Sequence, residues 1–139
     1  MMNSNEIWDP LRKKMVALTP EERVRQWFVD AVLKQTMGVP EHLMMSEVAF
    51  RLGDKNLRAD VVVYGRDAEP LAGGGGECKR PDVELTGDVL MQVVRYNMIL
   101  DVKYIFITNG TRTVGFKKDG ADALTRLTVF PRYDEMTLE

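Results

Sequence analysis

The segment from Arg58 to Tyr64 constrains the fold of this chain more than any other part of the sequence. Three consecutive valines, residues 61–63, follow Ala59 and Asp60 in it. β-Branched side chains have restricted χ1 angles and pack well on a pleated surface, which favours a strand over a helix. The chain is therefore expected to build a β-sheet that buries this run, with Asp60 at the start of the strand.

A second strong signal lies upstream, at Thr19-Pro20-Glu21-Glu22. Thr19 is a good N-cap, Pro20 fits the first helical turn, and Glu22 can close a capping box with Thr19. Gly38 suits the end of the helix, and Pro40 prevents its continuation. Apolar residues between these limits recur at spacings of three and four, as one buried helix face requires: Val24, Trp27, Phe28, Ala31 and Val32.

The remaining segments predict a sheet of mixed direction. Residues 1–18 are expected to form an arm with a short extended piece at 15–18. A second helix is expected after Thr86. Strands are expected at residues 47–52, 58–64, 72–79, 103–108, 113–117 and 124–130.

The connections between these elements predict their order in the sheet. Short turns make the first three strands antiparallel neighbours, and Asn109-Gly110 indicates a hairpin. The second helix, with Val89, Val93, Tyr96 and Leu100 along it, permits a parallel crossover from the third strand to the fourth. We expect one domain over residues 1–139, in the mixed α/β class, with helices against the sheet.

Composition excludes several classes of protein. One cysteine, Cys78, excludes a disulfide framework and a cysteine-rich zinc site. No apolar run approaches about 18 residues and the start lacks a basic segment followed by an apolar one, so we expect a cytoplasmic protein without a membrane partner. The net charge is −2, so any role on nucleic acid must rest on a local patch, a bound metal or partner domains.

The triplet Glu77-Cys78-Lys79 is the first candidate for chemistry. In a strand, Glu77 and Lys79 project from one face and Cys78 from the other, toward the core. The pair can be a simple exposed ion pair, and Asp60 a simple carboxylate at a strand end. Alternatively, Asp60 and Glu77 converge from adjacent strands on a divalent cation such as Mg²⁺, with Lys79 beside it to orient a water and offset charge on a phosphate.

Gln92 and Tyr96 are four residues apart on the second predicted helix and therefore share a face. Tyr96 can belong to the apolar stripe with Val89 and Val93, leaving Gln92 at its margin. Alternatively, both side chains reach phosphate oxygens or the metal site.

Together these residues resemble a known family. Asp60, an Asp 17 positions before Glu77-Cys78-Lys79, and Gln92-x-x-x-Tyr96 on the next helix resemble the PD-(D/E)xK nuclease superfamily. The chain is more closely similar to the N-terminal nuclease-like domain of type I restriction enzyme R subunits, from about residue 7 to residue 133. The segments that carry this resemblance are Trp8-Asp9-Pro10, Arg12-Lys13-Lys14, residues 16–22, Arg25-Gln26, residues 58–64, Glu77-Cys78-Lys79, Arg95-Tyr96-Asn97 and Thr108-Asn109-Gly110.

The resemblance implies a restriction-endonuclease-like central mixed β-sheet flanked by α-helices and a metal-dependent cut in DNA. It implies Asp60 and Glu77 as ligands of Mg²⁺ or Mn²⁺, the Cys78 carbonyl as a third ligand, and Lys79 as the catalytic lysine. Gln92 and Tyr96 would contact DNA or support the site. Glu22 would add an acidic group, although a capping box alone also explains it.

Two features depart from the family pattern. Residues 73–76 are four consecutive glycines where the family has an apolar strand, and each glycine in a strand costs roughly 0.5–1 kcal/mol relative to alanine. The sequence also lacks the Gly-x-x-x-x-Gly-Lys-Ser/Thr phosphate loop, so a helicase motor or modification subunit would come from another chain. A non-catalytic scaffold or binding module with the nuclease fold, and an RNA nuclease, are the alternatives.

Overall fold

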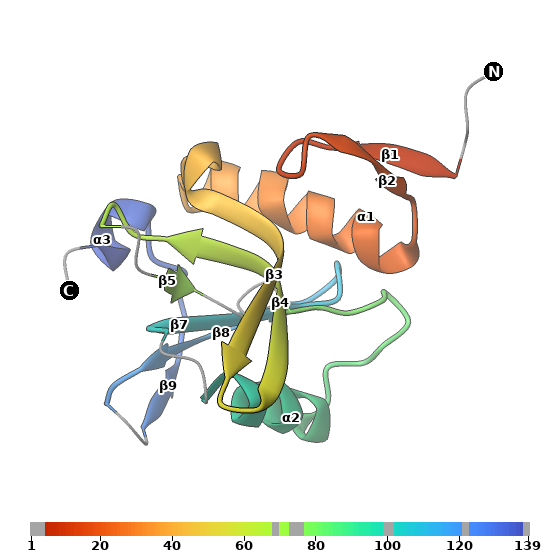
Figure 1. Ribbon diagram of the computed structural model, residues 1–139. Helices are drawn as coiled ribbons and strands as arrows, with labels where there is room; N and C mark the ends of the chain where they lie inside the picture. Colours follow the sequence, from red (N-terminus) through yellow and green to blue (C-terminus); the bar gives the residue numbers. More distant parts are fainter. Residues whose placement is uncertain (1–4, 68–69, 73–76, 99–101, 121–122, 138–139) are drawn as a thin grey trace.

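The computed structural model describes residues 5–67, 70–72, 77–98, 102–120 and 123–137, and Figure 1 shows their arrangement. Two sheets lie at the centre, and a short hairpin packs beside the first helix. Residues 73–76, within the predicted third strand, and Leu100, on the predicted second helix, lie outside the described residues. The structure contains both helices and sheets, which confirms the predicted mixed α/β class.

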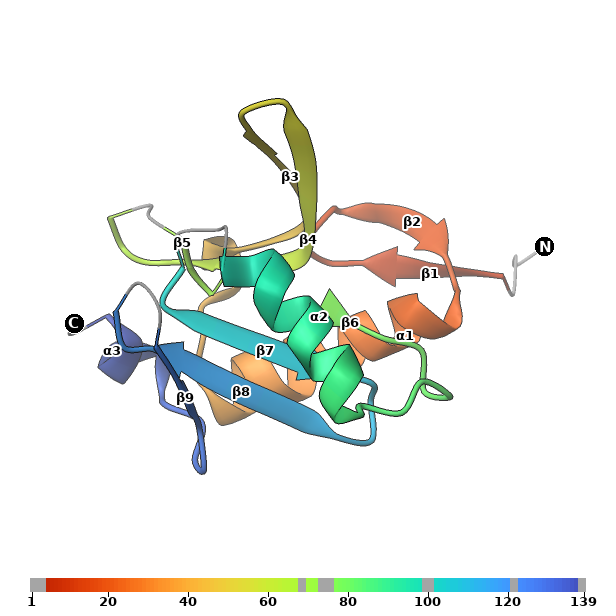
Figure 2. The same cartoon turned by 90° about the horizontal axis from the view of Figure 1, so that it is seen from below.

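Strand β7 (Tyr104–Thr108) is the centre of the packing, because all five of its residues are buried. Tyr104 and Phe106 pack in one core cluster with the first helical region, residues 20–36. Ile105 and Ile107 pack in a second cluster with Val93 of α2 (Gly87–Met98). Alternate residues of a strand face opposite sides, so β7 lies between two helical layers, as Figure 2 shows.

The strands form a three-stranded and a four-stranded sheet beside the small hairpin. In the first, β4 (Lys55–Tyr64) pairs antiparallel with β3 (Met44–Leu52) and with β5 (Pro70–Ala72). In the second, β6 (Glu77–Cys78) pairs parallel with β7, as the connection through the second helix permits. The strands β8 (Thr113–Lys118) and β9 (Leu124–Arg126) complete the second sheet in antiparallel order.

The single strand predicted over residues 72–79 is wrong. The structure has two short strands there instead, and they belong to different sheets: β5 pairs with β4, and β6 pairs with β7. Four consecutive glycines between them disfavour a continuous strand, because glycine has the largest backbone entropy to lose. Two strands that pair with different partners therefore replace the one that was expected.

The predicted N-terminal arm is also wrong in part, since its described residues contain a hairpin. Strand β1 (Glu6–Asp9) pairs antiparallel with β2 (Lys14–Ala17), and Trp8 lies opposite Met15. Each strand has only four residues, too few for a period-two pattern to stand out in the sequence. The hairpin packs beside helix α1 (Pro20–Trp27), as Figure 1 shows.

Helix α1 (Pro20–Trp27) begins as predicted, with Thr19 Oγ1 accepting a 3.1 Å hydrogen bond from the Glu22 amide. The capping box is not completed by the Glu22 carboxylate, because the Thr19 amide donates to the Ala17 carbonyl instead. Beyond Trp27 the helix widens into a π-helical segment, Phe28–Thr36. Gly38 ends it with φ +72, where a Cβ would lie 2.6 Å from the Arg132 side chain.

The C-terminal part differs from the predicted strand at 124–130. β9 ends at Arg126, and a short helix, α3 (Tyr133–Met136), follows that the sequence did not predict. Tyr133 is 2% exposed and its hydroxyl donates to the Tyr64 carbonyl at 2.8 Å, at the end of β4.

A short 3₁₀ turn, Glu41–Leu43, precedes β3. None of the described helices is long and apolar enough to span a membrane.

Candidate functional site

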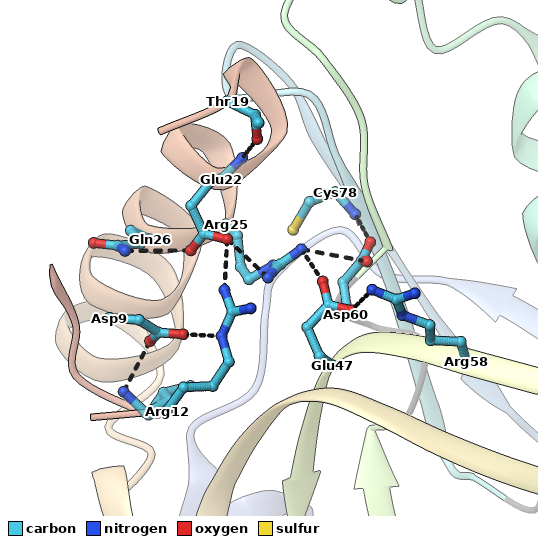
Figure 3. Close-up of polar contacts among 11 residues, drawn as sticks. Asp9, Arg12, Thr19, Glu22, Arg25, Gln26, Glu47, Arg58, Asp60 and Cys78 are labelled. Atoms are coloured by element: carbon cyan, nitrogen blue, oxygen red, sulfur yellow. Dashed lines mark hydrogen bonds and ion pairs between the residues drawn. The ribbon is translucent and has the colours of Figure 1, made fainter. Parts of the chain in front are cut away.

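Asp60 and Cys78 join the two large sheets. The Cys78 amide on β6 donates a 2.8 Å hydrogen bond to Oδ2 of Asp60 on β4 (Figure 3). The Lys79 amide donates to the Thr108 carbonyl of β7, also at 2.8 Å. The structure therefore places the Asp60 carboxylate against the backbone of the Glu77-Cys78-Lys79 segment, although the two lie 18 residues apart along the chain.

The structure describes the side chains of Cys78 and Lys79 but not that of Glu77. Cys78 is 6% exposed and belongs to the core cluster beside α1, which confirms its predicted inward direction. Lys79 is half-buried, directly after β6. The backbone of Glu77 lies in β6, but its side chain is outside the described structure. The convergence of Asp60 and Glu77 on one metal ion thus stays a prediction.

The guanidinium of Arg25, on α1, lies among three carboxylates. Its Nη1 is 2.9 Å from Glu22 Oε1, and its Nη2 is 2.6 Å from Glu47 Oε1 and 3.7 Å from Asp60 Oδ1. The Arg25 and Glu22 side chains are buried, whereas those of Glu47 and Asp60 are 18% and 24% exposed. One cation thereby offsets the mutual repulsion of acidic groups from α1, β3 and β4 (Figure 3).

Glu22 is the most heavily bonded of these carboxylates. Besides Arg25, its oxygens accept a 2.6 Å hydrogen bond from Arg12 Nη2 and a 3.2 Å bond from Gln26 Nε2. Neither sequence interpretation of Glu22 included these partners. The helix start is capped by Thr19, while the Glu22 carboxylate links α1 to the β1–β2 turn through Arg12.

Asp9 continues this network at the end of β1. It is 2% exposed and bonds the Arg12 side chain and, at 2.9 Å, the Leu11 amide. Burial by itself would raise the pKa of Asp9, but hydrogen bonds from Arg12 and the Leu11 amide, together with the Arg12 charge, lower the pKa below its ordinary value. Asp9 therefore stays ionised inside the protein.

Sequence reasoning missed Glu47 as a member of the cluster. The β3–β4 register runs through the pairs Ser46↔Val61 and Val48↔Ala59, which places Glu47 opposite Asp60. Glu47 has φ 55 and also pairs with Arg58. The signal was present in the turn: a two-residue connection at Gly53-Asp54 fixes the register and thereby the partner of every residue in the hairpin.

Gln92 and Tyr96 lie on α2, as predicted, but on the other side of β7 from α1. Gln92 is exposed. The side chain of Tyr96 is outside the described structure. Among the contacts of the described residues, none joins Gln92 to the carboxylates around Arg25. The role of Gln92 and Tyr96 at the site stays a prediction.

The donors near Asp60 suit a hard divalent cation in kind, because Mg²⁺ prefers carboxylate and carbonyl oxygens. The Asp60 side chain is partly exposed, and its carboxylate contacts β6. The Cys78 carbonyl belongs to this same strand. The described residues alone contain no group of three His, Cys, Asp or Glu side chains that would hold a metal.

Comparisons with known proteins give both a family and a fold. Residues 20–131 match the family model described as type I restriction enzyme R protein N terminus. Among solved structures, the chain resembles a fragment described as an HsdR subunit of a type I restriction enzyme from Vibrio vulnificus YJ016, with a TM-score of 0.56 and 23% identity. The match covers 84% of this chain and 24% of that one. No curated protein matched.

Proposed function

Since this chain belongs to the family of type I restriction enzyme R protein N-terminal regions, we propose that it is a metal-dependent DNA endonuclease domain with a restriction-endonuclease-like fold. One observation carries the proposal: the 2.8 Å bond from the Cys78 amide to Asp60. It holds a carboxylate of β4 against the short strand that begins with Glu77 and is followed by Lys79. A cation site built from two strands needs such a fixed approach, because catalytic groups must be held within about 0.5 Å of their working positions.

In this proposal Asp60 and Glu77 hold Mg²⁺ or Mn²⁺, and the Cys78 carbonyl is a third ligand. The bound ion would supply Lewis-acid chemistry at the phosphodiester and lower the pKa of a coordinated water. Lys79 orients the attacking water and offsets the negative charge that develops on the phosphate. Glu22 acts through Arg25, which connects it to Asp60. Gln92 and Tyr96 contact the DNA backbone or support the site from α2.

We propose DNA as the substrate and the cytoplasm as the location of the protein. The chain spans about a quarter of the length of the HsdR chain it resembles. We propose that a helicase motor or a modification subunit acts together with it. The sequence contains no phosphate-binding loop of the motor type.

A second function has one observation in its favour. Arg25 already pairs with Glu22, Glu47 and Asp60. Arg12 also pairs with Glu22 and Arg58 with Glu47, so cations of the protein itself partner the acidic groups. A non-catalytic module would need no more than this, with the ion pairs holding α1, β3 and β4 together. The two functions differ in whether Asp60 and Glu77 bind a divalent cation.

Calorimetric titration of Mn²⁺ and Mg²⁺ into the wild type, Asp60→Ala and Glu77→Ala separates them. Glu84→Ala removes an exposed carboxylate outside the predicted ligand set and is the matched control. The nuclease proposal expects binding in the wild type and in Glu84→Ala, and loss in the other two. Equal binding by all four proteins, or binding by none, would favour the non-catalytic module. Cleavage of single-stranded DNA, duplex DNA and RNA then identifies the substrate.

A further inference from the structure

A pocket of about 570 Å³ opens between the β1–β2 hairpin, the first helical region and the start of β3. Its lining includes Trp8 from β1, Trp27 from the end of α1 and Ser46 from β3. Pockets that bind small organic groups fall between about 300 and 1,000 Å³. The volume therefore fits one nucleotide-sized group.

The pocket contains both tryptophans of the chain. Trp8 is 53% exposed and Trp27 is 42% exposed, although indole rings are usually more completely buried in a chain of this size. Exposed indole faces in a concave site are suitable for stacking against another planar ring.

Two buried polar atoms of the lining have no hydrogen-bond partner in the described structure. Arg25 is 6% exposed, and its Nη atoms are used by the carboxylates, but its Nε is unpartnered. Ser46 Oγ is likewise buried and unpartnered. Buried polar groups are nearly always bonded, so these two atoms can gain partners if side chains of the lining move to admit the polar edge of a ligand.

The lining offers one cation to an anionic ligand. Its cations are Arg23, Arg25 and Lys34, of which Arg25 is paired with the carboxylates around it and Lys34 lies 3.2 Å from Glu41. Asp9 is already paired with Arg12, and Asp30 accepts a hydrogen bond from Gln35 at 3.0 Å. Arg23 is exposed and has no ion pair among the described residues, which leaves it available to a phosphate.

We propose that this pocket binds an unstacked nucleotide of single-stranded DNA. The base stacks on the exposed tryptophans, and its polar edge bonds Arg25 Nε and Ser46 Oγ once the side chains that cover these atoms move aside. The adjoining phosphate lies at Arg23. The choice of DNA as ligand rests on the proposed function. Arg25 lines the pocket and also contacts Asp60, so the bound nucleotide would lie beside the proposed cleavage site.

Intrinsic tryptophan fluorescence tests the proposal directly, because every tryptophan of the chain lines the pocket. Short oligo(dT) is titrated in EDTA, and a duplex of equal length is titrated in parallel. We expect oligo(dT) to quench the fluorescence and the duplex to bind more weakly. Trp8→Ala should weaken oligo(dT) binding about five- to a hundredfold, the range measured for single base–aromatic stacks.

Three further variants control for misfolding and for the neighbouring site. Trp8→Phe should restore most of the affinity, and Ser46→Ala should lower it without removing a ring. Met91→Ala changes an exposed apolar residue of α2, away from the pocket, and should bind as the wild type does. Binding of oligo(dT) in EDTA requires no divalent cation, so failure of the nuclease proposal and failure of this one are distinguishable.

Three results would overturn the nucleotide pocket. The first is the absence of fluorescence quenching by oligo(dT). The second is an affinity for the duplex equal to that for oligo(dT), together with no effect of Trp8→Ala on either. The third is tighter binding of N-acetyltyrosinamide than of thymidine monophosphate. The last result would assign the pocket to an aromatic side chain of a protein partner.

Discussion

The Cys78 amide donates a hydrogen bond to the Asp60 carboxylate. This 2.8 Å bond connects β6 of the four-stranded sheet with β4 of the three-stranded sheet. Asp60 thus has a structural role that is independent of any metal. Experiments on Asp60 must separate the two roles.

Asp60→Ala should lower the free energy of unfolding by about 1–3 kcal/mol, because the Cys78 amide loses its acceptor. Asp60→Asn keeps an acceptor oxygen and should lose less stability, while metal binding falls in both variants. Urea unfolding followed by circular dichroism gives the first quantity and calorimetry the second. If Asp60→Asn bound Mn²⁺ like the wild type, Asp60 would not be a metal ligand.

Arg25→Met should be among the most destabilising single changes, by about 3–5 kcal/mol, because it removes the buried cation that Glu22, Glu47 and Asp60 share. Arg23→Met, on the exposed side of the same helix, should change stability by no more than about 0.5 kcal/mol. Urea unfolding measures both. The double variant Glu22→Gln/Arg25→Met should lose less than the two single changes added together, and simple additivity would mean that the pair is not coupled.

Asp9 should contribute to the acid sensitivity of the fold. The pKa of Asp9 is lower in the folded protein than its ordinary value of 3.8, so the unfolded chain binds the proton first as the pH falls. The stabilisation is present above the ordinary value and is lost as the pH falls through the folded pKa. Urea midpoints measured over a pH series should therefore decline less steeply for Asp9→Asn than for the wild type. Asp54→Asn, in an exposed turn, should keep the wild-type slope.

Lys79→Met should lower the rate of metal-dependent DNA cleavage by about a hundredfold or more, because a positioned proton-transfer or charge-stabilising group contributes this much. Lys14→Met removes an exposed lysine of β2 and should leave the rate unchanged. Cleavage is measured with any partner subunit present. Metal affinity should remain near that of the wild type in both variants, and an unchanged rate in Lys79→Met would remove this lysine from the mechanism.

Tyr133→Phe should cost about 0.5–1.5 kcal/mol, since it removes the hydrogen bond from a buried hydroxyl to the Tyr64 carbonyl while keeping the ring. Val129→Ala, at a residue that is 78% exposed, is the neutral comparison. Thermal unfolding monitored by circular dichroism measures the difference. Equal midpoints for all three proteins would show that α3 contributes no stability through this bond.

The elements with the clearest patterns were predicted well. The valine run became β4, the start of α1 was located from Thr19 and Pro20, and the hairpin at Asn109-Gly110 joins β7 to β8. Membership of the restriction family was also predicted from ordered short motifs and is confirmed by the family match over residues 20–131. In each case the determining residues are close together in sequence.

The elements that were missed lack such local patterns. The four-residue strands β1 and β2 and the short helix α3 are too brief for a periodic signal, and they gain stability from the partners they contact. The extent of the single domain over residues 1–139 stays a prediction. So do the roles of Glu77, Lys79, Gln92 and Tyr96.

The sequence by itself determined the types of the main elements, the family and the acidic residues available for chemistry, because propensity, capping and turn chemistry act over a few residues. Only the tertiary structure decided which groups meet. The register of β3 and β4 places Glu47 opposite Asp60, and helix packing inserts Arg25 among three carboxylates. These contacts join distant segments, and their energies depend on burial and on the directions of side chains, which no local pattern encodes.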